Sequence, residues 1–352
     1  MLIRGIRLFH ARINLVNPYR LSFTTLKNID SIVVEIELEN GAVGIGEAVP
    51  LKGYSDETKV SIINDAINII NRVNLIDVLS LKELLVEKLP NSHFVISAFF
   101  VAIENAMGKI LIPSKISIPL VCSISSGANY KDLVEKSYEY YDNGFRTIKV
   151  KVGRNISEDC SLARRLLSEL PLDYKIRFDA NQGYSYQQAV KFGKTICGNN
   201  MNLVELFEQP FSVNQWDDHR KFIQNFPKIP VMIDESIITR DDITKAADIG
   251  ATYVKLKLFK HKGILDLLKL AKYARKLEMK VVLGNGVATS IGNLHEAIAY
   301  NVFGDFEGAS EGNGFTRLTT ETIQNSPKLN SGRLEWVRNS KINPSQFDKK
   351  LY

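Results

Sequence analysis

The sequence predicts an α/β protein: a (β/α)8 barrel of the TIM type, with an N-terminal α+β capping domain that is completed by the C-terminal segment. Three observations support this prediction. The 352 residues suit one large domain with a smaller accessory domain. Short apolar runs alternate with amphipathic helical windows from about residue 120 to residue 310. Most of these runs end 23 to 29 residues apart, which is the spacing of βα units.

The first part of the chain has a different pattern. Its first fifty residues alternate apolar and polar positions as strands do, and Glu39-Asn40-Gly41 is typical of a hairpin turn. Three windows of helical spacing follow, the last with Ser92 as its expected N-cap. The expected strands are residues 3–16, 31–39 and 42–49, and the expected helices are residues 56–73, 80–89 and 92–112. Strands and helices in separate blocks indicate an α+β domain.

The barrel is expected to begin after Pro113, where runs and helices start to alternate. Its eight expected strands are residues 120–125, 147–152, 175–179, 203–208, 230–234, 253–258, 280–284 and 303–310. The predicted domains are residues 1–113 for the cap, 114–318 for the barrel and 319–352 for a C-terminal segment packed on the cap. A dinucleotide-binding fold is disfavoured, because the glycine-rich clusters at 41–46 and 284–286 lack its spaced fingerprint.

The composition excludes several other classes of protein. The chain is 45% hydrophobic and 24% charged, which is typical of a globular protein and not of a disordered or fibrous one. The apolar stretch closest to a membrane span, residues 94–112, is interrupted by Glu104, Asn105 and Lys109. The formal charge of +6 is scattered without a basic stripe, so we expect neither nucleic-acid binding nor membrane insertion.

The N-terminus and the cysteines indicate a cytoplasmic protein. The first residues run directly into a strand pattern and carry no secretory cleavage signature. Cys122, Cys160 and Cys197 are odd in number and lack the spacing of metal ligands. We therefore expect three reduced, buried thiols.

Charged residues end five successive strands of the predicted barrel, at the edge where barrels carry their active sites. In chain order they are Lys151, Asp179, Glu208, Asp234 and Lys257. One acid at a strand end is usually a solvated turn residue or a helix cap, but three converging carboxylates would repel one another unless a cation lay among them. An all-oxygen ligand set favours Mg²⁺, with Mn²⁺ as an alternative, over zinc.

Lysines are predicted on both sides of the three acids. Lys149 and Lys151 point to the same side of their strand, so their ammonium groups lie within about 7 Å of each other. This proximity and a nearby dication should lower the pKa of at least one of them and make it a general base. Lys257 would approach from the opposite side of the barrel mouth. In the alternative interpretation the lysines only neutralise the acids, which does not explain why they flank them on both sides.

A cation between two opposed lysines suits the removal of a proton next to a carboxylate. The cation would hold the substrate carboxylate and stabilise the enediolate that forms when the α-proton leaves. One lysine would remove the proton, and the other would return it to the opposite face or act as electrostatic support.

At these residues the chain resembles the enolase superfamily, specifically the muconate-lactonising-enzyme subgroup of the mandelate racemase/muconate lactonising enzyme family. The resemblance covers nearly the whole length. The motifs that carry it are Thr-Ile-Lys149-Val-Lys151, Asp179-Ala-Asn181, Glu208-Gln-Pro, Asp234-Glu235 and Lys257-Leu-Phe-Lys-His-Lys-Gly263. The His/Asp dyad of the mandelate-racemase subgroup is absent, because the seventh strand ends Gly284-Asn285-Gly286 and His295 falls within a predicted helix.

The resemblance implies a role for each matching residue. The implied Mg²⁺ ligands are Asp179, Glu208 and Asp234, and the implied acid/base pair is Lys151 and Lys257. Three further matches have supporting roles. They are Lys149, which would neutralise the substrate carboxylate or tune the neighbouring lysine, and Asn181 and Glu235, which would lie behind the metal ligands.

Substrate identity is expected to depend on the eighth strand. Dipeptide epimerases of the subgroup carry Asp-x-Asp there to hold the substrate ammonium, whereas this chain has Glu311-Gly-Asn313. Glu311 resembles instead the single glutamate of cycloisomerases, and Glu311 and Asn313 are both candidate substrate contacts. An upstream Asp305-Phe-Glu307 has similar chemistry but fits the register less well.

Two loops of the cap are expected to close over the site. They are residues 17–25 and 51–55, and closure would exclude water from the reaction. Tyr19, Arg20 and Tyr54 lie on these loops and are candidate contacts for the tail of the substrate.

The expected activity is a Mg²⁺-dependent isomerisation that begins with abstraction of the proton α to a carboxylate. A racemase or epimerase of an amino-acid derivative is favoured, because two opposed lysines let the proton leave one face and return to the other. A muconate-type cycloisomerase and an o-succinylbenzoate-synthase-like syn-dehydratase are the enzymatic alternatives, and a ligand-binding barrel is the non-enzymatic one. The expected partner is a small-molecule carboxylate substrate, and because family members often form dimers or octamers, a homo-oligomer is expected.

Overall fold

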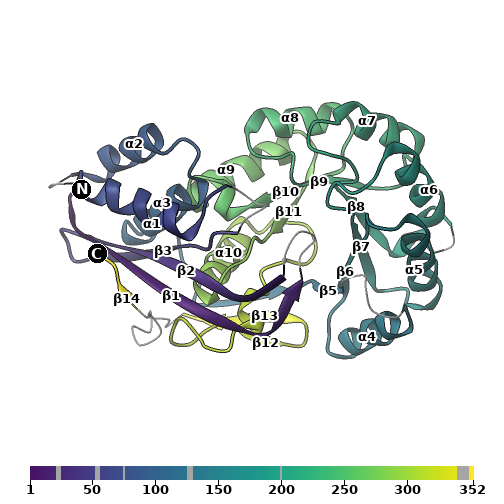
Figure 1. Ribbon diagram of the computed structural model, residues 1–352, viewed down its shortest axis with the longest axis horizontal. Helices are drawn as coiled ribbons and strands as arrows, with labels where there is room; N and C mark the ends of the chain where they lie inside the picture. The colour runs from purple at the N-terminus through teal and green to yellow at the C-terminus, as the bar shows by residue number, and fades with distance from the viewer. Residues whose placement is uncertain (21–24, 52–55, 74–75, 125–129, 199, 339–348) are drawn as a thin grey trace.

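A four-stranded antiparallel sheet with the order β14-β1-β2-β3 forms the N-terminal part of the protein (Figure 1). The computed structural model describes residues 1–352 except 21–24, 52–55, 74–75, 125–129, 199 and 339–348. The strands are β1 (Ile3–Arg20), β2 (Thr25–Leu38), β3 (Val43–Ala48) and β14 (Lys349–Lys350), and the helices beside them are α1 (Lys59–Ile70), α2 (Val78–Lys88) and α3 (His93–Ala106). The predicted hairpin turn is confirmed, with Gly41 in the left-handed region at φ +79°.

Close packing of α3 on β3 holds the core of this N-terminal part together. Gly44 and Gly46 leave no room for a side chain, because an added Cβ would lie 2.0 Å from the Ala102 carbonyl oxygen and 1.9 Å from that of Ala98. The apolar faces of the sheet and of the three helices meet in one buried cluster. The apolar residues that alternate along the strands and those that recur at helical spacing therefore pack in the same core.

The predicted polar loop at residues 17–25 is wrong at its start, because β1 continues to Arg20. Tyr19 pairs with Leu26 and Arg20 with Thr25, so the hairpin is longer than the polar composition indicated. The register shifts between Asn14 and Tyr19, where β1 has extra residues that include Pro18. Proline has no N–H for the ladder, and the irregularity lets the strand pass it.

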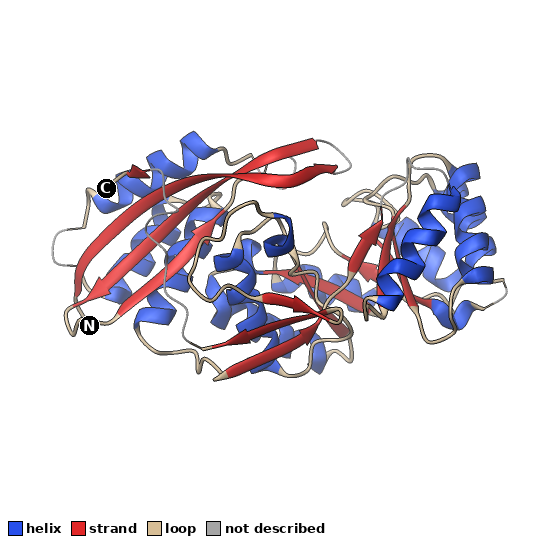
Figure 2. Ribbon diagram, turned by 90° about the horizontal axis from the view of Figure 1, so that it is seen from below, coloured by secondary structure: helices blue, strands red, loops and turns tan. Residues whose placement is uncertain are grey.

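A seven-stranded parallel sheet, ordered β11-β10-β9-β8-β7-β6-β5, forms the second unit, with helices along its convex side (Figures 1 and 2). The strands are β5 (Cys122–Ile124), β6 (Thr147–Lys151), β7 (Lys175–Asp179), β8 (Val204–Glu208), β9 (Val231–Ile233), β10 (Tyr253–Lys257) and β11 (Lys280–Gly284). The helices are α4 (Tyr130–Asp142), α5 (Ile156–Glu169), α6 (Tyr186–Ile196), α7 (Trp216–Asn225), α8 (Arg240–Asp248), α9 (Gly263–Lys276) and α10 (Ser290–Phe303). Seven of the eight predicted parallel strands are thus present as regular strands.

The two faces of this sheet carry different side chains. One set of alternate positions packs against the helices in the largest buried cluster of the described residues. On the other face, Leu206, Met232, Tyr253 and Val282 form a small separate cluster. Because side chains alternate, the residues two positions further along these strands lie on the same face, and several of them are charged.

The predicted eighth strand, residues 303–310, is wrong as a regular strand. Helix α10 continues through Phe303 and ends at Gly304, whose φ is +69°. The following segment still makes backbone bonds on both sides: the Glu307 N–H donates to the Val281 carbonyl at 2.8 Å, and the Ser310 N–H donates to the Pro119 carbonyl at 2.8 Å. Left-handed backbone at Gly304 and Gly308 interrupts the extended run that the apolar pattern indicated.

The C-terminal segment divides between two places. Strand β14 pairs with β1 of the N-terminal sheet. Strands β12 (Lys328–Asn330) and β13 (Arg333–Val337) instead form a three-stranded sheet with β4 (Lys115–Pro119). Figure 2 shows this sheet apart from the N-terminal one.

The structure qualifies one further local expectation, for Ser92, and contradicts another, for Cys197. Ser92 stands at the N-cap of α3, but its hydroxyl donates to Asp65 at 2.8 Å, and the Glu57 carboxylate accepts the first N–H groups of the helix instead. Cys197 is exposed, because it caps the C-terminus of α6 and faces outward, whereas Cys122 and Cys160 are buried. Among the described residues, no helix is both long and apolar enough to cross a bilayer.

Two carboxylates, one partly and one fully buried, join the N-terminal unit to helices of the second unit. Glu47 on β3 accepts N–H groups of Thr289 and Gly292 at the start of α10, at 3.1 and 2.9 Å. Glu104 on α3 accepts the N–H of Ile264 at 2.7 Å and that of Leu265 at 3.3 Å, at the start of α9. A carboxylate is favourable at a helix N-terminus, where free N–H groups and the helix dipole meet.

Glu104 should make the stability of the protein depend on pH. Burial raises the pKa of Glu104 from its ordinary value of 4.5 to about 7 in the folded protein. The folded state therefore binds the proton more tightly than the unfolded state, and the free energy of unfolding should fall by about 3 kcal/mol as the pH rises from about 4.5 to about 7. We expect Glu104→Gln to remove this fall in urea denaturation followed across that range.

The exposed Glu83→Gln on α2 is the matched control and should keep the wild-type dependence. If Glu104→Gln and the wild type show the same slope between pH 5 and pH 7, Glu104 is not the group that titrates.

Candidate active site

The carboxyl ends of β6, β7, β8 and β10, with residues that follow β9, β10 and α10, bring charged side chains into one network of ion pairs. We call this set the charged network. Its members are the ammonium groups of Lys149, Lys151, Lys255, Lys257 and Lys260 and the carboxylates of Asp179, Glu208, Asp234 and Glu311. The structure thus brings together the five strand-end residues that the sequence singled out.

Lys149 and Lys151 lie on one side of the network. The Lys151 Nζ donates to Asp179 Oδ2 at 2.5 Å and to Asn181 Oδ1 at 2.6 Å. The Lys149 Nζ lies 2.8 Å from Asp179 Oδ2 and 3.0 Å from Glu208 Oε2, and its side chain is 7% exposed. Lys151 is 28% exposed, so of the two lysines it is the one open to a ligand.

Lys257 lies on the other side, with strands β7, β8 and β9 between its strand and that of Lys151. Its Nζ donates to Asp234 Oδ2 at 2.7 Å. Lys260, just after the end of β10, donates to the carbonyl groups of Asp234 and Ile237 at 3.1 and 3.2 Å. Lys151 and Lys257, which the sequence placed on opposite sides of the acids, therefore lie on different strands, one on each side of the acidic group.

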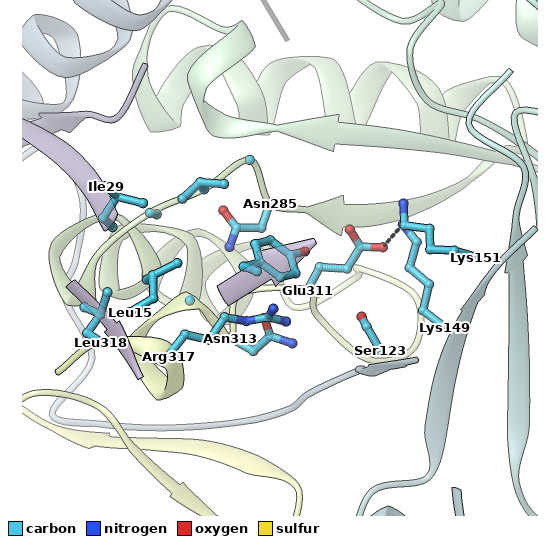
Figure 3. A pocket seen from close by; sticks show the side chains of 15 residues that line it. Leu15, Ile29, Ser123, Lys149, Lys151, Asn285, Glu311, Asn313, Arg317 and Leu318 are labelled. Carbon is cyan, nitrogen blue, oxygen red and sulfur yellow. Dashed lines mark hydrogen bonds and ion pairs between the residues drawn. The ribbon is translucent and has the colours of Figure 1, made fainter. Parts of the chain in front are cut away.

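Glu311 enters the network from the segment that follows Ser310. Its Oε1 accepts hydrogen bonds from Lys149 at 3.0 Å and from Lys255 at 2.7 Å, and the side chain lines the same cavity as Lys151 (Figure 3). Asn313 lines this cavity too, and its amide donates to the Val121 carbonyl at 2.9 Å.

Side chains behind the acids hold them in place. The Asn181 amide donates to Glu235 Oε1 at 3.0 Å, so these two predicted supporting residues are in contact. The side-chain oxygen of Gln209, which the sequence analysis did not single out, accepts the Asp234 N–H at 2.9 Å. Asn181 and Gln209 have φ of +41° and +35°, an uncommon backbone conformation that is frequent where strands turn into functional loops.

Of the two lysines for which a lowered pKa was predicted, Lys149 does not have one. Burial alone would lower the pKa of Lys149, but the carboxylates of Asp179, Glu208 and Glu311 outweigh burial and raise the pKa well above its ordinary value. The pKa of Asp234 lies well below its ordinary value, because Lys257, Lys255 and Lys260 outweigh the effect of burial.

The other acids and Lys260 are also shifted. Burial and the neighbouring Asp179 carboxylate raise the pKa of Glu208 to about 8. Burial also lowers the pKa of Lys260 to about 8, since the Asp234 carboxylate compensates only in part.

The donor set suits a hard divalent cation. Glu208 Oε2 and Asp234 Oδ1 are buried oxygens whose nearby cations are the ammonium groups of Lys149 at 3.0 Å and Lys260 at 3.6 Å. Glu235 Oε2 is a third buried oxygen, and it accepts no hydrogen bond. In the described part of the chain no three acidic, histidine or cysteine side chains are arranged to share an ion as they stand. Lysine ammonium groups lie between the carboxylates, and an ion would have to displace them. With that exchange, the all-oxygen set fits Mg²⁺.

The cavity beside Lys149 and Lys151 has a volume of about 60 Å³, and a groove of about 680 Å³ that also includes Lys151 lies next to it. Tyr19 lines both, and the Arg317 guanidinium lies 3.9 Å from the centre of its ring. The side chain of Arg20 and all of Tyr54, the other two candidate contacts, lie outside the described residues.

The alternative acids upstream of Glu311 are outside the site. Asp305 and Glu307 both bind Arg275 of α9, at 2.7 and 3.2 Å.

Lys255 is a member of the network that the sequence analysis did not select. The signal was present, because Lys255 precedes Lys257 by two residues just as Lys149 precedes Lys151.

Comparison with known proteins gives the class of this enzyme. Residues 3–110 match the model of the mandelate racemase/muconate lactonizing enzyme N-terminal domain, and residues 132–338 match the enolase C-terminal domain-like model. The protein is therefore an enzyme of the enolase superfamily. Within it, the chain belongs to the mandelate racemase/muconate lactonizing enzyme family.

Two curated relatives are similar over most of their length. An o-succinylbenzoate synthase from Listeria innocua is 26% identical and covers 97% of this chain and 93% of its own. An L-amino acid-D/L-Glu epimerase from Francisella philomiragia is 30% identical, with 76% of this chain and 79% of that protein covered.

A solved structure shares the fold. The dipeptide epimerase from Enterococcus faecalis, complexed with Mg and the dipeptide L-Leu-L-Tyr, superposes with a TM-score of 0.85 over 96% of this chain and 97% of that one, at 21% identity. Such a likeness shows the fold and leaves the substrate to be argued from the site.

Proposed function

We propose that this protein is a Mg²⁺-dependent racemase or epimerase that abstracts the proton α to the carboxylate of an amino-acid derivative. The observation that carries the proposal is the pair of lysines at the ends of β6 and β10, with three acids between them. Epimerases that act on amino-acid derivatives are among its relatives, which supports the same reaction.

Asp179, Glu208 and Asp234 would hold the ion, whose charge stabilises the enediolate when it is bound. Lys151 would take the α-proton from one face of the substrate, and Lys257 would deliver a proton to the other face. Lys149, buried and ionised among carboxylates, would contribute a fixed positive charge next to the substrate carboxylate.

The other residues would position these groups. Asn181 and Glu235 would lie behind Lys151 and the acids, in keeping with their hydrogen bond to each other. Glu311, Asn313 and Tyr19 line the cavity and would contact the substrate. Arg20 and Tyr54 stay sequence predictions.

We also propose the domain division and the closure of the barrel. Residues 1–113 would form the cap, 114–318 the catalytic barrel and 319–352 the C-terminal segment. The segment 307–311 would take the eighth position in the barrel, as supported by its backbone bonds to Val281 on one side and to Pro119 on the other. A homo-oligomeric state, a cytoplasmic location and Mn²⁺ as an alternative ion also stay predictions.

Proton exchange in D₂O tests the function directly. With Mg²⁺ present, we expect at least one acid in a panel of N-acyl amino acids, dipeptides and muconates to exchange its α-proton for deuterium, as followed by ¹H NMR. Loss of optical activity in the same sample would identify racemisation, and EDTA should stop both signals. If no acid exchanges in the presence of the ion, the proposal is contradicted for these substrate classes.

A dehydratase is the second candidate, because the o-succinylbenzoate synthase relative covers nearly the whole chain. A syn-dehydratase needs one base on one face of the substrate. A dehydratase would convert a β-hydroxy acid to an unsaturated product. It would not cause the amino-acid derivatives of the exchange panel to lose optical activity. The two candidates therefore differ in product and in stereochemical outcome.

A further inference from the structure

Lys255 lies at the centre of the charged network. Its Nζ lies 2.6 Å from Glu208 Oε1, 2.7 Å from Glu311 Oε1 and 3.7 Å from Asp234 Oδ2, and its side chain is 0% exposed. Three of the four carboxylates in the network therefore surround one ammonium group. Two of them are proposed metal ligands.

The fold makes room for this lysine. An added Cβ at Gly284 of β11, the neighbouring strand, would lie 2.5 Å from Lys255 Cδ and 3.2 Å from Lys257 Cγ. Any larger residue at Gly284 would displace the lysine stem. The side chain of Lys255 therefore fills a space that the absence of a side chain at Gly284 leaves within the site, and it is not exposed to solvent.

The charges of the network do not favour a divalent cation. Five ammonium groups meet four carboxylates, and the buried carboxylate of Glu235 beside them is a fifth, so the charges of the fully ionised groups cancel. Without Lys255 the same groups would carry one net negative charge. Because Coulomb energies are large in a buried site, one charge at this place changes the affinity for an ion strongly.

We propose that Lys255 is an internal cation that bridges Glu208 and Glu311 and weakens the binding of Mg²⁺ to the free enzyme. The inference rests on the proposed function, since it takes Glu208 and Asp234 as metal ligands. The ammonium group satisfies one oxygen of Glu208 and competes with an ion for the negative charge of Glu208 and Asp234. Metal binding would then require the ion to displace this ammonium group from the two carboxylates.

Binding of Mn²⁺ alone to the full-length protein tests the proposal without any substrate. The free ion is measured by electron paramagnetic resonance, and Mg²⁺ is added as a competitor to show that both ions use one site. We expect Lys255→Met to bind Mn²⁺ at least about tenfold more tightly than the wild type. Lys276→Met, which removes an exposed lysine at the end of α9, should leave the affinity unchanged.

Glu311 provides variants that keep the test decisive if Lys255→Met does not fold. Glu311→Gln removes one negative charge and should bind Mn²⁺ at least about tenfold more weakly than the wild type. The double variant Lys255→Met/Glu311→Gln restores the wild-type charge and should bind within about threefold of the wild type. Circular dichroism checks that each variant is folded.

Two results would overturn the inference, and they differ in what they say of the proposed function. If the folded Lys255→Met variant, or Glu311→Gln in its place, binds Mn²⁺ as the wild type does, the internal-cation role is wrong and the metal site stands. If neither the wild type nor any variant binds the ion at millimolar concentration, the metal site itself is wrong and the inference falls with it.

Discussion

Lys151→Ala is expected to lower the rate of α-proton exchange by about 10²- to 10⁴-fold, the usual contribution of a general base. The Lys151 ammonium group is held by Asp179 and Asn181 at the open side of the network, where a substrate would meet it. The measurement is deuterium incorporation by ¹H NMR with each enantiomer of a substrate found in the exchange panel. Loss of exchange should occur with at least one enantiomer.

Lys257→Ala should have a different effect. Lys257 lies on the other flank of the acids, so without it Lys151 can still exchange the proton on its own face. We expect exchange with one enantiomer to continue while racemisation stops. Lys262→Ala, an exposed neighbour, is the control and should keep full activity. Full racemising activity in both Lys151→Ala and Lys257→Ala would show that the assigned acid/base roles are wrong.

The second large effect is expected from Arg177→Met, which should reduce the free energy of unfolding by about 3–5 kcal/mol. Arg177 on β7 is fully buried on the inner face of the sheet. Its guanidinium makes two bonds of 2.9 Å to Glu205 and one of 2.9 Å to the Ala309 carbonyl. An added Cβ at Gly308 would lie 2.6 Å from its Nη2, so the segment that follows α10 packs directly on it.

Urea denaturation measures this loss of stability. The cost arises because Glu205 and the Ala309 carbonyl lose their partner in a buried place. Arg177→Met/Glu205→Leu leaves no unpaired charge and should recover most of the loss. Arg165→Met removes the exposed pair with Glu169 on α5 and should change stability by no more than about 0.5 kcal/mol. A loss below about 1 kcal/mol in Arg177→Met would contradict the structural role.

Local sequence patterns correctly predicted those elements of secondary structure that are decided by residues close together in the chain. Seven of the eight parallel strands and the turn at Gly41 follow from apolar alternation and turn chemistry, which act within a few residues. The same alternation places Lys149 with Lys151, and Asp179 two positions beyond Arg177, on one face of their strands.

The errors fall where long-range contacts decide. Tyr19 and Arg20, in the predicted polar loop, pair with a second strand, and the residues after Phe303 in the predicted strand 303–310 lie between two distant segments without forming a regular strand. Ser92 stands at the N-cap of α3, but the Phe94 N–H donates to Glu57, which is 37 residues away from Phe94 in the chain. The intrinsic preference of a residue for helix, strand or loop is a weak signal, and contacts with residues distant in the chain override it at these positions.

The sequence by itself determined the α/β class, the family and the acids and lysines at the strand ends, because these depend on residue type and on a two-residue period. Only the tertiary structure decided which charges pair. Glu311 meets Lys149 across 162 positions of the chain, and Lys255 meets Glu208 across 47. Ion pairing depends on distances of a few ångströms, and curvature of the sheet, which no local pattern encodes, sets those distances.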